Sequence, residues 1–340
     1  MKRTRTLWRT VALASLAAAL VACGQGNSTR ASGSEPTGSA LPPASPQASS
    51  LPPAADPGVN GFSGKRAYDY VAKQVAFGPR PPGSDAIHQL QAYLLDQLHG
   101  FGCNVDVDNF HANTPEGSIA MKNITAKIPG TSPGVILLAT HYDTDTIDPN
   151  DRKMTNFVGA DDGGSSTGLM LEMARVLCGK PQPATIWIVF LDGEEALQHW
   201  SDTDGTYGSR EMAAKLALSG QLAHVKALVL ADLVGSKDLR LRREDNSVAS
   251  GAWLTDIIWA TAAKLGYQRV FLSTHAAFED DHLPFVARKV PSADIIRCCS
   301  DEIPYWHTPQ DAMDKISAQS LQIVGDVILT SLPEIARHIR

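Results

Sequence analysis

The chain has little of what several common classes of protein depend on. Aromatic residues make up 6% of its 340 residues, only five residues are cysteines, and 30 Lys and Arg face 36 Asp and Glu. The resulting formal charge of −6 argues against a nucleic-acid-binding protein, because phosphate backbones attract basic surfaces. The cysteine spacing matches no cysteine-based metal site. The remaining composition, 43% hydrophobic and 19% charged, is typical of a globular protein with a buried core.

Long hydrophobic runs are also missing, and the run near the N-terminus is short. Residues 11–22 are apolar but too few to span a bilayer comfortably, and a basic head precedes them. Residues 20–23, at the end of this run, resemble a bacterial lipobox, in which Cys23 would be lipidated and become the mature N-terminus. A plain secretory signal cleaved nearby is the alternative. Either way, we expect residues 1–22 to be a signal peptide. The basic head consists of Lys2, Arg3, Arg5 and Arg9.

Lipid on Cys23 would anchor the protein in the membrane of a bacterial cell envelope, facing the periplasm or the exterior. Cleavage after residue 22 removes four positive charges and no acid, so the formal charge of −6 becomes about −10. Residues 24–60 are rich in Ser, Pro, Gly and Ala and contain no aromatic residue, which predicts that 23–60 is a disordered tether. Residues 61–340 are then long enough for one α/β domain.

The remaining cysteines would lie in an oxidising compartment. Their pairing cannot be deduced from the sequence. Adjacent Cys298 and Cys299 are compatible with a vicinal disulfide and equally with buried free thiols. The four cysteines in question are Cys103, Cys178, Cys298 and Cys299.

Strands and helices are predicted to alternate along this domain. Ser84 is a good N-cap and Gly100 a stop for a helix whose apolar residues recur at helical spacing. The continuous apolar run 135–139 is expected of a strand covered on both faces. The pattern predicts an α/β fold, a single globular domain with a mixed, mostly parallel twisted central sheet flanked by helices. Strands are expected at 105–110 and 119–128 as antiparallel neighbours, and at 135–139, 185–191, 225–231 and 294–297. Further helices are expected at 169–177, 207–218, 253–265 and 316–338.

Polar side chains follow the predicted strands at the points where they end. Because open α/β sheets bind ligands at the carboxyl ends of their strands, we expect these side chains to converge on one edge. They are His141 and Asp143 after 135–139, Asp192 to Glu195 after 185–191, Asp232 at the end of 225–231, and Trp306 and His307 after 294–297.

This set of residues predicts a metal site. Histidine and carboxylate ligands without cysteine suit a catalytic zinc, which takes three protein ligands and leaves one position open. Our candidates are Asp162, Glu195 and His307, with glycines beside Asp162 that permit a tight backbone. Glu194 points in a different direction from its neighbour Glu195, so one can bind the metal while the other carries protons.

The chain resembles the animal-type glutaminyl cyclases (glutaminyl-peptide cyclotransferases), a branch of the zinc aminopeptidase clan. The resemblance covers essentially all of residues 65–338. Its most specific parts are Phe190-Leu191-Asp192-Gly193-Glu194-Glu195-Ala196 with His199-Trp200-Ser201, Tyr207-Gly208-Ser209-Arg210, Asp232-Leu233, Asp280-Asp281-His282 with Pro284-Phe285, and Trp306-His307-Thr308.

The resemblance implies one zinc ion per chain, held by Asp162, Glu195 and His307. It also implies conversion of the N-terminal glutamine of peptides or proteins to pyroglutamate, with release of ammonia. Glu194 would be the general acid/base. The other implied site residues are Asp232 and Asp280 as a hydrogen-bonded acidic pair, and Trp200 and Trp306 as the lining of the substrate pocket. We expect a monomer.

Two positions that contact substrate in this family depart from its pattern. Glu279 stands where the animal enzymes tend to have Gln, which adds negative charge at the pocket rim. Ile303 stands where they have an aromatic residue. Asp161, beside Asp162, is a further acid that is more typical of the aminopeptidase branch. These departures leave the peptide preference open.

A two-zinc aminopeptidase is the main alternative. Asp162 would then bridge the two metals and Glu194 would activate water. The features against it are Trp200, Trp306 and the run 280–282, although Trp200 is also compatible with a plain core position. A non-catalytic envelope lipoprotein on the same scaffold is a second alternative, which the intact set of catalytic residues disfavours. The two-zinc ligands would be His141, Asp162, Glu195, Asp232 and His307.

Overall fold

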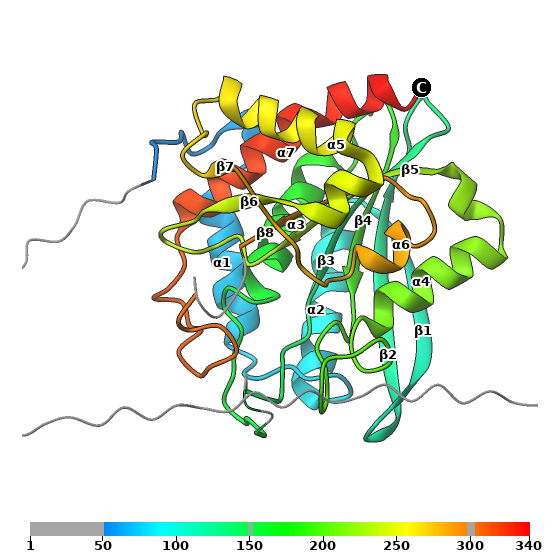
Figure 1. The fold of residues 1–340 in the computed structure, drawn as a ribbon, viewed down its shortest axis with the longest axis vertical. Coiled ribbons are helices and arrows are strands. Elements are labelled where there is room, and N and C mark those ends of the chain that lie inside the picture. Colours follow the sequence, from blue (N-terminus) through cyan, green and yellow to red (C-terminus); the bar gives the residue numbers. More distant parts are fainter. Residues whose placement is uncertain (1–50, 149, 151, 298–302) are drawn as a thin grey trace, which may run out of the picture. The chain divides into compact units, whose positions relative to one another are not determined.

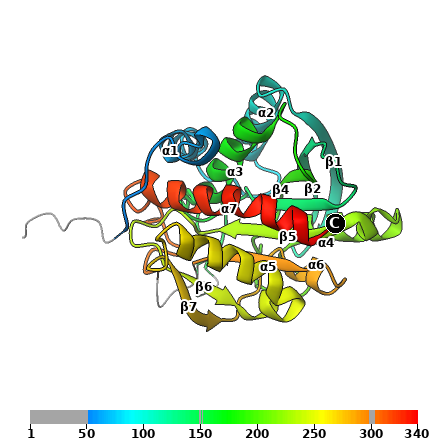
Figure 2. The same ribbon diagram turned by 90° about the horizontal axis from the view of Figure 1, so that it is seen from above.

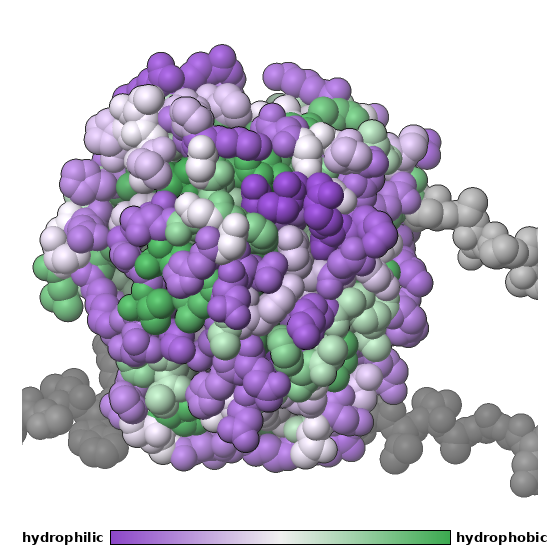
Figure 3. All heavy atoms as spheres, turned by 180° about the vertical axis from the view of Figure 1, so that it is seen from behind, coloured by the Kyte–Doolittle hydropathy of each residue, from purple (hydrophilic) through white to green (hydrophobic). Residues whose placement is uncertain are grey.

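The computed structural model describes residues 51–340, apart from 149, 151 and 298–302. The predictions for the signal peptide, for Cys23 and for a Cys298–Cys299 pair lie outside the described residues. No helix in the described part of the chain has the length and hydrophobicity needed to cross a membrane. Seen from behind the view of Figure 1, the surface is mainly hydrophilic, with hydrophobic residues in small separate groups (Figure 3).

A mixed six-stranded sheet forms the centre of the domain, in the order β1-β2-β4-β3-β5-β8 (Figure 1). β1 and β2 are antiparallel neighbours, β2 is antiparallel to β4, and the other neighbours are parallel. The predicted α/β fold with a mostly parallel sheet is therefore confirmed. The strands are β1 (Asn104–Thr114), β2 (Gly117–Ile128), β3 (Val135–His141), β4 (Thr185–Leu191), β5 (Val225–Asp232) and β8 (Ser292–Ile296).

Helices cover both faces of this sheet. One side carries α2 (Asp85–Gly100), α3 (Gly164–Leu177) and α7 (Ala318–His338), with α1 (Gly64–Val75) packed on α3 and α7 (Figure 2). The other side carries α4 (Tyr207–Leu218) and the short α6 (Leu283–Val286). Helix α5 (Asp245–Lys264) packs on β8 and α7, beside a small parallel pair of strands, β6 (Leu241–Glu244) and β7 (Phe271–Ala276). Two short 3-10 helices are η1 (Val59–Gly61) and η2 (Gln221–His224).

The central strand β3 shows why its sequence is apolar throughout. Val135, Leu137 and Ala139 pack into the core under α4, while Ile136 and Leu138 belong to the larger core beneath α2, α3 and α7. All seven residues of β3 are buried, because successive side chains point to opposite covered faces. The strand is therefore buried along its whole length. The polar residues that follow it lie at the carboxyl edge of the sheet.

The predicted boundaries differ from the observed ones mainly at helix starts. Helix α3 begins at residue 164 and α5 at residue 245, both earlier than predicted, and α1, α6, β6 and β7 were not predicted. The folded part also begins before residue 61. Leu51 is buried in the main core, and the Gln319 side chain donates a hydrogen bond of 2.6 Å to the carbonyl of Pro52. The predicted tether is thus too long by about ten residues at its C-terminal end.

Cys103 and Cys178 form a disulfide that joins the start of β1 to the end of α3 across 75 residues of chain. A loop of this length is expected to stabilise the fold by about 4 kcal/mol, because the crosslink restricts the unfolded chain. We therefore expect Cys103→Ser to lower the free energy of unfolding by roughly that amount in a urea titration. The double variant with Cys178→Ser should lose no more than the single one. An unchanged unfolding midpoint would contradict this role.

Candidate metal centre and active site

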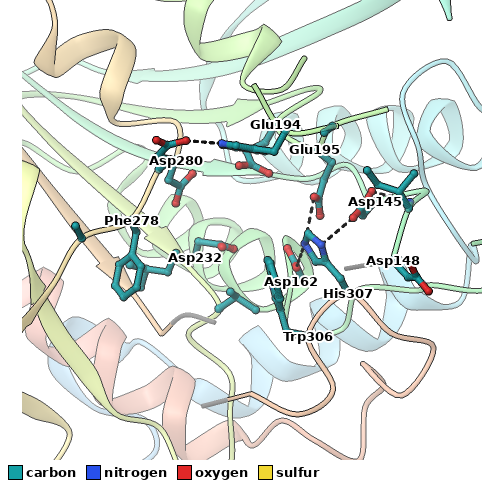
Figure 4. A pocket seen from close by; sticks show the side chains of 17 residues that line it. Asp145, Asp148, Asp162, Glu194, Glu195, Asp232, Phe278, Asp280, Trp306 and His307 are labelled. Carbon is teal, nitrogen blue, oxygen red and sulfur yellow. Dashed lines mark hydrogen bonds and ion pairs between the residues drawn. The ribbon is translucent and has the colours of Figure 1, made fainter. Parts of the chain in front are cut away.

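A cavity of about 370 Å³ opens where β3, β4 and β5 end (Figure 4). This is the edge of the sheet at which the polar residues were predicted to converge. It collects side chains that lie far apart in the sequence, from Asp145 to His307. Every described residue of the predicted one-zinc site lines it, with the exception of Ile303. Ile303 is fully buried among Leu233, Ile296 and Tyr305 and does not line the cavity, so its role as a substrate contact stays a prediction.

His307 lies at the centre of the predicted metal site (Figure 4). Its Nε2 lies 3.3 Å from Asp162 Oδ2 and 3.4 Å from Glu195 Oε2. Its Nδ1 lies 2.9 Å from Asp145 Oδ2, which fixes the orientation of the ring. Asp162 Oδ2 and Glu195 Oε1 are buried and have no hydrogen-bond partner among the described residues. Two buried carboxylate oxygens that accept no hydrogen bond, beside an imidazole, fit a bound cation, and a set of one histidine and two carboxylates suits zinc.

A second imidazole approaches Asp162 from the other side. His141 Nε2 lies 3.1 Å from Asp232 Oδ1 and 3.3 Å from Asp162 Oδ1. The group His141, Asp162 and Asp232 is therefore compact enough to hold an ion of its own. This is the geometry that the two-zinc alternative requires.

The tandem glutamates are held by Asp143, which follows β3. Its two carboxylate oxygens accept hydrogen bonds from the backbone amides of Glu194, at 3.0 Å, and Glu195, at 3.2 Å. Gly193 precedes them with φ 71°, and a Cβ there would lie 2.7 Å from the sulfur of Met121. The turn therefore requires glycine, and it directs Glu195 to His307 while Glu194 faces the other part of the cavity.

The loop that carries Asp162 is fixed in a similar way. Asp311 accepts hydrogen bonds from the backbone amides of Asp161, at 2.8 Å, and Asp162, at 3.0 Å. The side chain of Asp161 turns away from the cavity and accepts from the amide of Gly235, at 2.7 Å, and the hydroxyl of Tyr305, at 2.7 Å. Asp161 therefore stabilises the loop and does not take part in the site. Its presence beside Asp162 no longer favours an aminopeptidase.

Asp232 and Asp280 both line the cavity, and no described hydrogen bond joins them, so their pairing through a shared proton stays a prediction. Asp232 Oδ1 is bonded to His141 Nε2 instead. Asp280 Oδ1 accepts from the amide of Asp281, and its Oδ2 is buried without a partner. Burial raises the pKa of each carboxyl, and the charge of Asp232 raises that of Asp280 further.

Glu194 has the environment of a proton carrier. Burial raises the pKa of Glu194 well above its usual range; the nearby charge of His141 opposes this effect, and that of Asp280 adds to it. A carboxyl with a raised pKa accepts a proton readily and returns it near neutral pH, which is what general acid/base catalysis needs.

The matching family model covers residues 123–332, which is more than half of the chain. The chain belongs to peptidase family M28. It is 41% identical to a glutaminyl cyclase from an Acidobacteriales bacterium, with a TM-score of 0.74 over 82% of this chain and 96% of that one. A Zn-dependent exopeptidase from Parabacteroides distasonis is 30% identical, with a TM-score of 0.74 over 80% of this chain and 98% of that one. The glutaminyl-peptide cyclotransferase of Drosophila melanogaster is 28% identical over 259 residues, 68% of this chain and 70% of that protein. The predicted resemblance is thereby confirmed.

Two tryptophans border the cavity of this M28 domain. Trp306 stacks on the ring of His307, with ring centres 3.8 Å apart. Trp200 is 39% exposed, so it is not a core residue. Its loop is fixed by Asp204, whose carboxylate accepts hydrogen bonds from the backbone amides of residues 197, 198 and 199 at 2.9–3.0 Å. The Trp200 side chain is thus held at the mouth of the cavity.

Sequence reasoning missed two residues of this site. Asp145 contacts His307, and Phe278 lines the cavity opposite the metal ligands (Figure 4). The alternation of His141, Asp143 and Asp145 from the end of β3 onward was a usable signal, because residues two apart in an extended chain face the same side. No comparable signal marks Phe278, whose place depends on how the chain leaves β7.

We expect Trp200→Ala to lower kcat/KM about tenfold while the melting temperature stays within about 2 °C of the wild type, because the ring is half exposed and its loop is held by backbone contacts. Peptide turnover and thermal unfolding measure the two effects. Trp253→Ala is the matched control, since that ring packs on His338 away from the cavity. Unfolding of the Trp200 variant would instead make Trp200 a core residue.

Proposed function

We propose that this M28 protein is a glutaminyl-peptide cyclotransferase that converts the N-terminal glutamine of peptides or proteins to pyroglutamate. The observation that carries the proposal is the cavity, in which buried Glu194 lies beside Asp162, Glu195 and His307 and behind two tryptophans. The similarity to glutaminyl cyclases over nearly their full length supports the same reaction. Glutamine, curled so that its amine reaches its own carboxamide, is small enough to enter a cavity of about 370 Å³.

Asp162, Glu195 and His307 would hold one zinc ion, for which their unpaired buried oxygens are suited. When bound there, zinc would supply a Lewis acid for the oxygen of the substrate carboxamide. The outer contact from Asp145 to His307 Nδ1 keeps Nε2 directed at the site.

Glu194 would carry the proton through the reaction. The α-amine of the glutamine attacks the side-chain carboxamide carbon, a new C–N bond forms, and Glu194 accepts the proton that the amine loses. The bond from that carbon to the amide nitrogen then breaks. Glu194 returns the proton to the leaving nitrogen, so ammonia departs and the five-membered lactam remains.

The neighbouring side chains would orient the substrate. Asp280 has an unpaired buried oxygen that can accept a hydrogen bond from the α-amine. Asp232, held by His141, adds negative charge on the same side of the cavity. Trp200 and Trp306 would exclude water and hold the curled conformer, which supplies much of the rate in a ring closure.

A peptide that begins with glutamine tests the proposal when it is followed by mass spectrometry with and without a chelator. The expected result is loss of one ammonia with all peptide bonds intact, stopped by chelator and restored by zinc. A single zinc per chain in metal analysis is part of this expectation.

The two-zinc aminopeptidase is kept as the second candidate, because His141 lies within 3.3 Å of Asp162 and Asp232 and would complete a second metal site. The similarity to the exopeptidase from Parabacteroides distasonis supports it as well. Release of free glutamine in the same assay, together with two metal ions per chain, would favour this activity over cyclisation.

We further propose that the protein acts as a monomeric lipoprotein of the bacterial cell envelope, anchored through Cys23 and facing the periplasm or the exterior. The basic head, the short apolar run and the lipobox-like residues 20–23 support the anchor. In cells, Cys23→Ser should abolish incorporation of radiolabelled palmitate and release the protein from the membrane fraction. A wild-type protein that is recovered unlabelled in the soluble fraction would contradict the anchor.

A further inference from the structure

Apart from His307, the ionisable side chains that line the cavity in the described structure are all acidic. Eight of its 17 lining residues are Asp or Glu, His307 is the one histidine, and none is Lys or Arg. Six of the eight acids have roles in the proposed reaction or contact His307. The other two acids, Asp148 and Glu279, have no role in the proposed reaction and do not contact His307.

Asp148 does not present a free charge. Arg152 forms an ion pair with it, and the Nε of that arginine donates a hydrogen bond of 2.7 Å to Asp148 Oδ2. This contact lowers the pKa of Asp148 to about 2, so the carboxylate is ionised and paired. Its effect on a substrate is therefore largely cancelled by the neighbouring guanidinium.

Glu279 is different, because no basic residue in the described part of the chain pairs with its charge. The side chain is exposed, and its hydrogen bond comes from a neutral donor, Trp200 Nε1, at 2.7 Å. No basic side chain within the described ranges forms an ion pair with Glu279. Trp200 therefore holds an uncompensated carboxylate at the mouth of the cavity.

The position of Glu279 relative to the reacting glutamine is set by its neighbour. Asp280 lies inside the cavity, 2% exposed, where the substrate amine is proposed to bind. Glu279 is the next residue along the chain, with its Cα about 3.8 Å from that of Asp280. Its side chain is exposed, so it lies on the solvent side of the proposed amine site. The second residue of a peptide substrate leaves the cavity through this mouth and has to pass near Glu279 and Trp200.

Resting on the proposed cyclisation, we infer that Glu279 makes the enzyme select peptides with Lys or Arg directly after the N-terminal glutamine and disfavour Asp or Glu at that position. Its contact with Trp200 keeps the carboxylate at one place, where an extended cationic side chain can reach it. The aliphatic stem of Lys or Arg would at the same time pack on the exposed face of the Trp200 ring.

The expected size of this selectivity follows from the exposure of the pair. An exposed ion pair changes an affinity by about twofold to fivefold, and repulsion of an acidic residue acts in the opposite direction. We therefore expect kcat/KM for a Gln-Lys peptide to exceed that for a Gln-Glu peptide about tenfold at low salt, with Gln-Ala between them. At about 1 M salt the ratio should fall strongly, because the screening length is then about 3 Å.

Competition among Gln-Lys-Ala, Gln-Ala-Ala and Gln-Glu-Ala amides, followed by mass spectrometry, tests the inference in the full protein. In Glu279→Gln, the amide oxygen still accepts a hydrogen bond from Trp200, so the variant removes the charge alone. Its Lys-to-Glu ratio should fall to about twofold or less, and Glu279→Lys should reverse the preference. Asp96→Asn, which removes an exposed acid on α2, is the control and should keep the wild-type ratio.

The outcomes separate this inference from the proposed function. Cyclisation of all three peptides at equal rates by the wild type, or an unchanged Lys-to-Glu ratio in Glu279→Gln, would overturn the role of Glu279 and leave the cyclase intact. Absence of cyclisation with every peptide would overturn the proposed function, and the inference with it.

Discussion

Glu194→Gln is expected to lower kcat by about a factor of 10⁴, the upper end of what a general acid/base contributes, with zinc still bound. The amide of glutamine has nearly the shape of the carboxyl group but can neither accept the amine proton nor return it. The backbone contact from Asp143 to residue 194 is made by the peptide amide, so it survives the substitution. The ligands Asp162, Glu195 and His307 are also untouched.

Metal analysis and turnover have to be measured on the same preparation of this variant. Full zinc content with turnover lost would assign the proton transfer to residue 194. Glu334→Gln, an identical chemical change in an exposed pair on α7, should retain wild-type activity. Normal turnover in Glu194→Gln would remove the acid/base assignment, and loss of zinc would make Glu194 a ligand instead.

His307→Ala is expected to lower zinc affinity by more than about 100-fold, because removal of a ligand costs more than removal of an outer-shell partner. His307 is the only proposed ligand that would bind through nitrogen, and its Nε2 lies within 3.4 Å of a carboxylate oxygen of each of the other two ligands. Its backbone adopts φ 48°, which is unfavourable for a side chain of this size, so the surrounding structure holds it there.

Asp145→Asn provides a graded comparison for this experiment. It leaves the three ligands in place and weakens only the contact that orients His307, so zinc affinity should fall by about 10- to 100-fold. His275→Ala removes an exposed histidine of β7 that pairs with Asp245 and does not line the cavity, so it should retain wild-type affinity. Full zinc occupancy in His307→Ala would contradict the ligand set. Retention of one of two ions would point to a second site at His141.

Comparing His307→Ala with Glu194→Gln tests whether zinc binding and proton transfer are separate functions of the site. His307→Ala should lose turnover that added zinc partly restores, since Glu194 is intact. Glu194→Gln should stay inactive at every zinc concentration. The same zinc dependence in both variants would mean that the two residues serve one function, contrary to the separate roles proposed for them.

Sequence alone determined the features that depend on local patterns. The apolar runs of β3 and β4 predicted strands covered on both faces of the sheet, because in such a strand every side chain is buried and polar side chains are disfavoured. Ser84 marked the start of α2, where its hydroxyl accepts from the amide of Ile87. The polar residues at the strand ends had to converge, because neighbouring parallel strands end at the same edge of their sheet. The adjacent Glu194 and Glu195 could therefore be placed in a site.

Tertiary structure decided which of the acids take part in that site. Asp161 and Asp162 are neighbours, yet only Asp162 faces the cavity, since Asp161 is bound by Tyr305 and Gly235 from distant segments. The same holds for the disulfide between Cys103 and Cys178, for the contact between His141 and Asp232, and for the burial of Ile303. Each of these outcomes depends on contacts between segments far apart in the chain, and side-chain direction in a loop is fixed by such contacts rather than by local periodicity.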